Sequence, residues 1–134
     1  HDVDVLNDHK ISIFNNNSKR FIDDAVVDGH NEVIIYDFKL NKYSSYLTDS
    51  LIKQDVRTLT NGQSQILSNG DLLVEETKSG RILYFDADGS LRWTYVNRAD
   101  NGKTYIVSWS RLLYTDKDIK ITNNFLKSRD KCND

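Results

Sequence analysis

The chain has 134 residues, a formal net charge of −2 at pH 7, and neither proline nor methionine. This length suits one domain, and the nearly balanced charge provides no basic field that would attract nucleic acid. No apolar run approaches the roughly 20 residues of a membrane-spanning helix. The single cysteine, Cys132, excludes an internal disulfide and a cysteine-based metal cluster. We therefore expect no nucleic-acid partner and no membrane span.

The N-terminal part of the chain is predicted to contain a first group of strands. Residues 5–14 and 33–47 hold short runs of β-branched and aromatic residues, interrupted by polar turns. Such runs are typical of strands with at least one buried face. Extra residues around 15–31 lengthen the connection between the second and third strands. His9 and His30 lie in polar turns, so we interpret both as surface residues.

Residues 62–97 predict a complete antiparallel meander of four strands. Each of the six glycines in the chain follows Asp, Asn or Ser, and five of them divide the region from Gly62 onward into short segments. These dipeptides favour tight hairpins because glycine accepts positive φ angles. The turns recur at roughly 8–13 residues, the spacing of a meander of short strands. We expect no substantial helix within this stretch.

The order of elements repeats along the chain. Residues 5–14 align with 66–75, and residues 33–47 align with 81–96. A repeat of four antiparallel strands is typical of a blade of a β-propeller. A small closed barrel has a similar length, but it needs no repeat on this scale.

We therefore predict an all-β fold of antiparallel four-stranded meander blades, two to three blades of an incomplete β-propeller. Residues 1–115 form the partial propeller, with about 1–55 as the first blade portion and 56–115 as the second blade and a following strand. Residues 116–134 form a polar tail that adds one strand and a short helix. The outer strands need to be covered by missing blades, another copy or another protein. Because the chain starts at His1 and lacks methionine, we expect a fragment or a processed product.

The second blade resembles the C-terminal blade of the arylsulfotransferase-like propellers. The shared pattern is a Gly-x-x-Gln-x-Leu-x-Asn-Gly turn, a Gly-Arg-Ile turn and strand, and an Asp-Gly turn before Trp-x-Tyr-Val-Asn. The matching residues are Gly62, Gln65, Leu67, Asn69, Gly70, Gly80, Arg81, Ile82, Asp88, Gly89, Trp93, Tyr95, Val96 and Asn97. Residues 105–114 are similar to the family's following strand, which carries an arginine in an aromatic context, here Arg111.

The N-terminal residues resemble a second element of the same family. That element is a His-Asp pair that begins a strand, followed by a turn and a strand that ends in Phe-Asp-Asn. His1 and Asp2 match its start, and Phe14 and Asn16 match its end, whereas Asn15 stands where Asp is usual. The resemblance thus covers roughly residues 1–115.

The resemblance implies sulfuryl transfer from an aryl sulfate to a phenolic acceptor through a sulfated histidine, without a nucleotide sulfate donor. It implies that His1 is the catalytic nucleophile and that Asp2, Asn16 and Arg111 are binding residues, with Asp2 orienting the imidazole. We expect no metal site and no cofactor. Because missing blades would supply other catalytic groups, the isolated chain is expected to be inactive. The family also implies an extracytoplasmic location, periplasmic or secreted.

Other interpretations of the same residues remain open. The chain can instead be a noncatalytic β-propeller scaffold or a glycan- or protein-binding module. Asn16 can serve turn formation rather than binding, and Arg111 can serve packing rather than anion binding. The aromatic residues Trp93 and Trp109 suggest either an aryl-binding surface or, as we favour, core packing between sheets.

Overall fold

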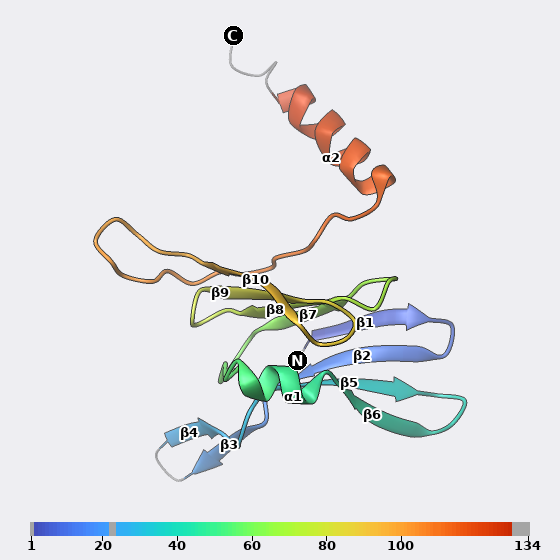
Figure 1. Cartoon of the computed structure of the whole chain (residues 1–134), viewed down its shortest axis with the longest axis vertical. Helices are drawn as coiled ribbons and strands as arrows, with labels where there is room; N and C mark the ends of the chain where they lie inside the picture. The colour runs from blue at the N-terminus through green and yellow to red at the C-terminus, as the bar shows by residue number, and fades with distance from the viewer. Residues whose placement is uncertain (1, 22–23, 130–134) are drawn as a thin grey trace.

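The computed structural model describes residues 2–21 and 24–129, and its strands form two four-stranded antiparallel sheets that lie side by side (Figure 1). The first sheet has the strand order β1 (Asp2–Asn7), β2 (Lys10–Asn15), β5 (Glu32–Asp37) and β6 (Lys42–Tyr46). The second sheet contains β7 (Gln63–Ile66), β8 (Leu72–Glu76), β9 (Arg81–Phe85) and β10 (Leu91–Val96). Both are open meanders rather than parts of a closed barrel, which confirms the prediction of all-β, blade-like sheets.

A short hairpin is inserted between the second and third strands of the first sheet. It consists of β3 (Ser18–Phe21) paired with β4 (Asp24–Val27). The N–H of Asp28 donates to the carbonyl of Asn17 at 2.8 Å and closes the neck of the insertion. The β2–β5 ladder stays in register up to Asn15. The predicted lengthening of this connection is therefore confirmed, and it leaves the blade intact.

The hydrophobic core lies between the two sheets. Six core residues come from the central strands β2, β5, β8 and β9, and where one strand supplies two they are alternate residues, as the period of two along a β-strand requires. Two further core residues come from a short helix and the chain after it. The fully buried side chains are Phe14, Val33, Leu51, Val56, Leu72, Val74, Leu83 and Phe85. Each contributes about 1.5–3 kcal/mol by leaving water, so this layer fixes the position of one sheet on the other.

The helix expected in the tail is present, whereas a helix between the two sheets was not expected. The helix α1 (Thr48–Lys53) joins the sheets and buries Leu51, and its six residues are too few to show a helical period in the sequence. The helix α2 (Asp116–Arg129) projects away from the sheets (Figure 1). Thr115 caps it by accepting the N–H of Asp118 at 3.1 Å. The strand expected in the tail is therefore wrong for residues 116–129. Neither helix of the described chain is long and apolar enough to cross a bilayer.

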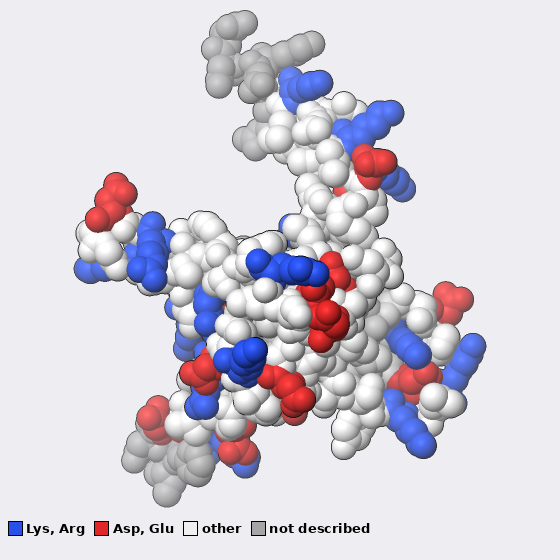
Figure 2. Space-filling view, in the orientation of Figure 1, with Lys and Arg blue, Asp and Glu red and all other residues white. Residues whose placement is uncertain are grey.

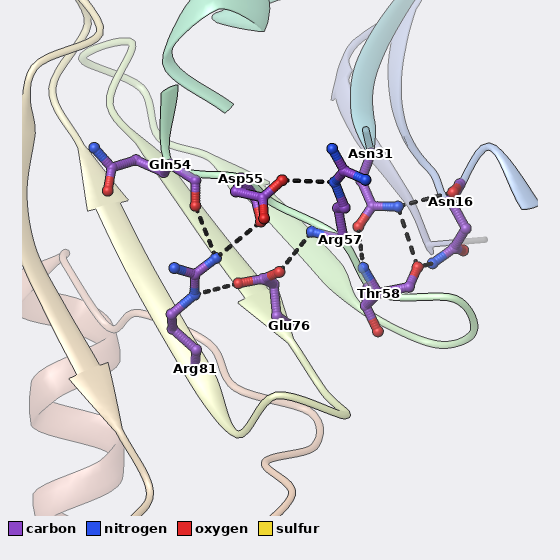
Figure 3. A network of polar contacts seen from close by, with 8 residues as sticks. All are labelled: Asn16, Asn31, Gln54, Asp55, Arg57, Thr58, Glu76 and Arg81. Carbon is purple, nitrogen blue, oxygen red and sulfur yellow. Dashed lines mark hydrogen bonds and ion pairs between the residues drawn. The ribbon is translucent and has the colours of Figure 1, made fainter. Parts of the chain in front are cut away.

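The connecting segment, residues 54–61, is fastened to the second sheet by one buried carboxylate (Figure 3). Glu76 on β8 is 1% exposed, and its Oε1 accepts the N–H of Arg57 at 2.6 Å. Its Oε2 pairs with the guanidinium of Arg81, which also donates to the carbonyl of Gln54 at 3.0 Å. A buried charge is tolerated only when it is paired and hydrogen-bonded in this way. Glu76 thus ties the chain after α1 to both β8 and β9.

Exposed charges of opposite sign are intermixed on the face that Figure 2 shows. Several form surface ion pairs, such as Lys19 with Asp28 and Arg57 with Asp55. Pairs of this kind contribute little to stability because both partners remain solvated. The charges on this face therefore form no extended field of one sign.

Gly62 gives a test of the packing between the sheets. A Cβ at this position would lie 2.6 Å from Cε1 of Phe14 and 2.7 Å from Cγ2 of Thr58, and its φ is +86°. Gly102 has a similar φ of +78° with nothing within 4 Å, so Gly102→Ala is the matched control. Both variants carry the cost of a left-handed residue, roughly 1–2 kcal/mol. We expect Gly62→Ala to lose about 1–3 kcal/mol more in urea unfolding because it also overpacks the core. Equal losses would contradict this packing.

Glu76 gives a second test. We expect Glu76→Ala to lower the free energy of unfolding by about 3–5 kcal/mol, because it removes one partner of a buried ion pair. Glu76→Gln keeps an acceptor for Arg57 and should lose less. The control is Lys19→Ala in an exposed pair, for which a change of about 0–1 kcal/mol is expected. The account fails if Glu76→Ala unfolds at the same urea concentration as the control.

Candidate functional site

The candidate site lies where β1 of the first sheet meets β7 of the second sheet (Figure 1). Asp2 begins β1, and its Oδ2 accepts the backbone N–H of Ser64 on β7 at 3.1 Å. The Asp2 side chain is 11% exposed. A carboxylate that accepts a backbone N–H is held in one orientation. Asp2 therefore both links the two sheets and presents its second oxygen beside them.

Arg111 meets that second oxygen, although it is 109 residues away in the chain. Its Nη2 lies 3.3 Å from Oδ1 of Asp2 and 3.5 Å from Oδ1 of Asp4, and its Nη1 donates to Oε1 of Gln63 at 3.0 Å. The guanidinium thus contacts β1 and β7 together. Its side chain remains 36% exposed, so part of it is accessible to another group. The structure brings together two of the residues that the sequence predicted, Asp2 and Arg111.

The Arg111 segment, residues 105–114, is held by side chains of the second sheet. Glu75 on β8 is buried, and its Oε2 accepts the N–H of Ser110 at 2.6 Å. Gln65 on β7 accepts the N–H of Leu112 at 2.8 Å and donates to its carbonyl at 3.3 Å. The prediction of a strand here is wrong, because side chains rather than a neighbouring strand satisfy these backbone groups. The same contacts fix Arg111 in place.

A cavity of about 140 Å³ lies beside this cluster. Its walls come from the start of β1, the start of β7, the end of β8 and the Arg111 segment. The lining residues are Asp2, Asn61, Gly62, Gln63, Thr77, Ser108 and Trp109. Ligand pockets usually measure about 300–1,000 Å³, so this cavity accommodates a small polar group rather than a whole aryl sulfate.

The charge balance of the cluster is negative. Two carboxylates, Asp2 and Asp4, face one guanidinium, Arg111. Burial raises the pKa of Asp4, the nearby charge of Arg111 lowers it, and the charge of Asp2 raises it. Because burial is the largest of these effects, the pKa of Asp4 lies above its ordinary value. Among the described residues, no group of three or more His, Cys, Asp and Glu side chains is placed to hold a metal ion.

Asn16 supports the wall of the cavity by binding the connecting segment, residues 54–61. Its Nδ2 donates to the carbonyls of Thr58 at 2.8 Å and Asn61 at 2.7 Å. Asn31 donates in turn to the carbonyl of Asn16 at 2.8 Å (Figure 3). Both amide hydrogens of Asn16 are thus used on the backbone of the connecting segment. Its contact with the cavity is indirect, through the position of Asn61.

The histidines lie apart from the cluster or outside the described part of the chain. The predicted nucleophile, His1, falls outside the described residues. His9 lies in the turn between β1 and β2, where its N–H donates to Asn7 at 3.1 Å. The carbonyl of His30 accepts from Asn17 at 2.8 Å, next to the inserted hairpin. His9 and His30 are half-buried, so the surface interpretation holds only in part.

Sequence reasoning missed the residues that hold the Arg111 segment. Gln65 belongs to the family pattern, so its place in the motif was an available signal for a specific role. Glu75 and Glu76 carry a weaker signal, two acidic residues that end an otherwise apolar strand. Neither residue type nor spacing indicates that one of these carboxylates receives the N–H of Ser110, which lies 35 residues further along the chain.

Asp4 gives a test of the electrostatics. Its raised pKa favours the protonated form in the folded state, so its contribution to stability is present at low pH and is lost as pH rises through the folded-state pKa. Asp4→Asn, which resembles the protonated form, should raise the melting temperature at neutral pH. The gain should shrink as pH falls toward the ordinary aspartate pKa of ~3.9.

The control for this measurement is Asp8→Asn, which removes the same charge from an exposed turn. A lower melting temperature for Asp4→Asn at neutral pH would mean that the contact with Arg111 outweighs the cost of burial.

Comparison with known proteins identifies the family of this chain. A family model described as arylsulfotransferase (ASST) matches residues 1–98. No curated protein and no solved structure matches the chain. The matched region covers most of the chain and includes both sheets with Asp2 and Asn16, whereas Arg111 lies beyond it. The chain therefore belongs to the arylsulfotransferase family.

Proposed function

We propose that this chain contributes part of an active site for nucleotide-independent sulfuryl transfer from an aryl sulfate to a phenolic acceptor. The observation that carries the proposal is the contact of Arg111 with Asp2, the residue that follows His1. In this arrangement His1 is the nucleophile, Asp2 orients its imidazole, and Arg111 provides a cation near the reacting group. Membership of the family supports the reaction class.

The proposed chemistry proceeds in two displacements. A neutral imidazole nitrogen of His1 attacks the sulfur of the aryl sulfate, and the bond from sulfur to the phenolic oxygen breaks. The phenolate leaves and takes up a proton. The oxygen of a second phenol then attacks the sulfur of sulfohistidine, loses its proton and releases His1. The guanidinium of Arg111 balances the charge on the sulfuryl oxygens, for which its planar donors are suited.

The charge of the cluster indicates that further cations are needed. Arg111 alone faces two carboxylates and a sulfate donor, and an anion at this place gains too little from a single, partly neutralised guanidinium. We infer that further blades of a propeller, or another copy of the chain, supply these groups. On this proposal the 134-residue chain by itself has no appreciable turnover.

The exposed faces of the sheets support the proposal that other blades or another copy cover them. Large apolar side chains are exposed on both, including Val5 and Tyr43 on the first sheet and Trp93 and Tyr95 on the second. Additional blades packed on these faces would bury them as the present core buries the inner faces. We also propose an extracytoplasmic location, periplasmic or secreted, which rests on the family resemblance alone.

A second candidate function is a noncatalytic scaffold or a glycan- or protein-binding module. It is favoured by one observation, the negative balance of the cluster around Arg111, where neither His9 nor His30 lies. A site of this charge suits hydroxyl groups and cations better than sulfate.

Mass spectrometry distinguishes the two functions. The native protein, which includes the further blades or second copy inferred above, is exposed briefly to 4-nitrophenyl sulfate, and peptides around His1 are mapped. We expect one added sulfuryl group on His1, which is lost when phenol is added as acceptor. The adduct should be absent from His1→Ala and unchanged in His9→Ala, because His9 lies in a separate turn. A folded native protein that gains no adduct would support the noncatalytic alternative.

A further inference from the structure

Trp109 has an unusual backbone conformation beside the cavity. Its φ is +62°, in the left-handed region that bulky residues seldom adopt. The residue is also 78% exposed, so burial of the indole does not compensate for this conformation. Strained backbone of this kind concentrates at functional sites, where the surrounding structure enforces it. Core packing, which the sequence analysis favoured for this residue, does not account for the position of Trp109.

The neighbours of Trp109 enforce this conformation from both sides. On one side the N–H of Val107 donates to the carbonyl of Thr77 at 3.3 Å. On the other side Ser110 is held by the buried carboxylate of Glu75, and Arg111 is held by Gln63. The chain between these anchors has little freedom. As a result, Trp109 forms part of the cavity wall.

Trp93 provides a contrast within the same molecule. Its indole stacks on the ring of Tyr84, with ring centres 5.4 Å apart and planes within 1° of each other. It lies on β10, away from the cavity lining. Trp93 therefore already has an aromatic partner, whereas Trp109 lines a small polar cavity. The two tryptophans are a matched pair for an experiment.

We propose that Trp109 is a specificity-determining residue that stacks on the aromatic ring of the substrate. The position of the sulfuryl group near Arg111 rests on the proposed function. The contact between Trp109 and an aromatic ring does not depend on it. The cavity of about 140 Å³ holds the hydroxyl of an acceptor, because its one charged lining residue is the carboxylate Asp2. The sulfuryl group of a donor lies beside the cavity, at Arg111. The ring, which the cavity is too small to enclose, lies against the indole. The left-handed backbone positions that surface.

The test follows the indole N–H signals of this chain in nuclear magnetic resonance spectra of the native protein, in which the further blades or second copy supply the remaining cations. The chain has two tryptophans, and Trp93→Phe and Trp109→Phe assign the signals. Three probes are titrated separately. Phenyl sulfate carries both a ring and a sulfate, methyl sulfate carries only the sulfate, and phenol carries only the ring.

We expect phenyl sulfate and phenol to shift the signal of Trp109 and to leave that of Trp93 in place. Binding to the Trp109 variants is followed by the broadening of the probes' own proton signals. Trp109→Ala should weaken the binding of phenyl sulfate about 2- to 13-fold, the range expected for loss of an aromatic pair. Its binding of methyl sulfate should be unchanged. Trp109→Phe should retain part of the preference for the ring, and Trp93→Ala should retain all of it. An unshifted Trp93 signal in the Trp109 variants shows that they remain folded.

The outcomes separate this inference from the proposed function. If Arg111→Ala weakens both sulfates but Trp109→Ala leaves the preference for phenyl sulfate unchanged, the role of Trp109 is wrong and the sulfate site stands. If phenol shifts Trp109 while neither sulfate binds, the aryl contact stands and the sulfuryl-transfer proposal fails. If no probe shifts Trp109, the inference is overturned.

Discussion

Two adjacent glutamates on one strand hold the rest of the structure in place. Glu75 and Glu76 follow each other on β8, so their side chains point to opposite faces of the sheet. Glu76 accepts the N–H of Arg57 and fixes the connection between the sheets. Glu75 accepts the N–H of Ser110 and fixes the segment that carries Arg111. Buried carboxylates here do what a neighbouring strand does elsewhere, because they receive backbone donors from chain that has no regular structure.

The meander was predictable from the sequence because local chemistry determines it. Glycines after Asn, Asp or Ser define the turns, and alternating apolar residues define the buried faces. The inserted β3–β4 hairpin was visible as extra length between matched repeats. The helix α1 was not, because six residues show no helical period, and Leu51 becomes a core residue only when the two sheets are packed.

The site was predictable only in part, for a related reason. The His-Asp and Arg motifs indicated Asp2 and Arg111, and the structure places these two side chains in contact. The resemblance of residues 105–114 to the family's following strand indicated a strand, but Gln65 and Glu75 satisfy backbone groups there. Hydrogen bonds from side chains to backbone groups depend on contacts distant in sequence, and no local sequence pattern predicts them.

The length of the inserted hairpin does not affect the register of the sheet, because a hydrogen bond closes the base of the insertion. The N–H of Asp28 donates to the carbonyl of Asn17, so the insertion closes on itself before the chain rejoins the sheet. Beyond that neck the β2–β5 pairing continues without a shift from Asn15 to Lys10. Residues can therefore be gained or lost at the hairpin in the course of evolution without disturbing the strands that carry the core. The first blade thus offers a location at which relatives can diverge in length while they keep the same interior.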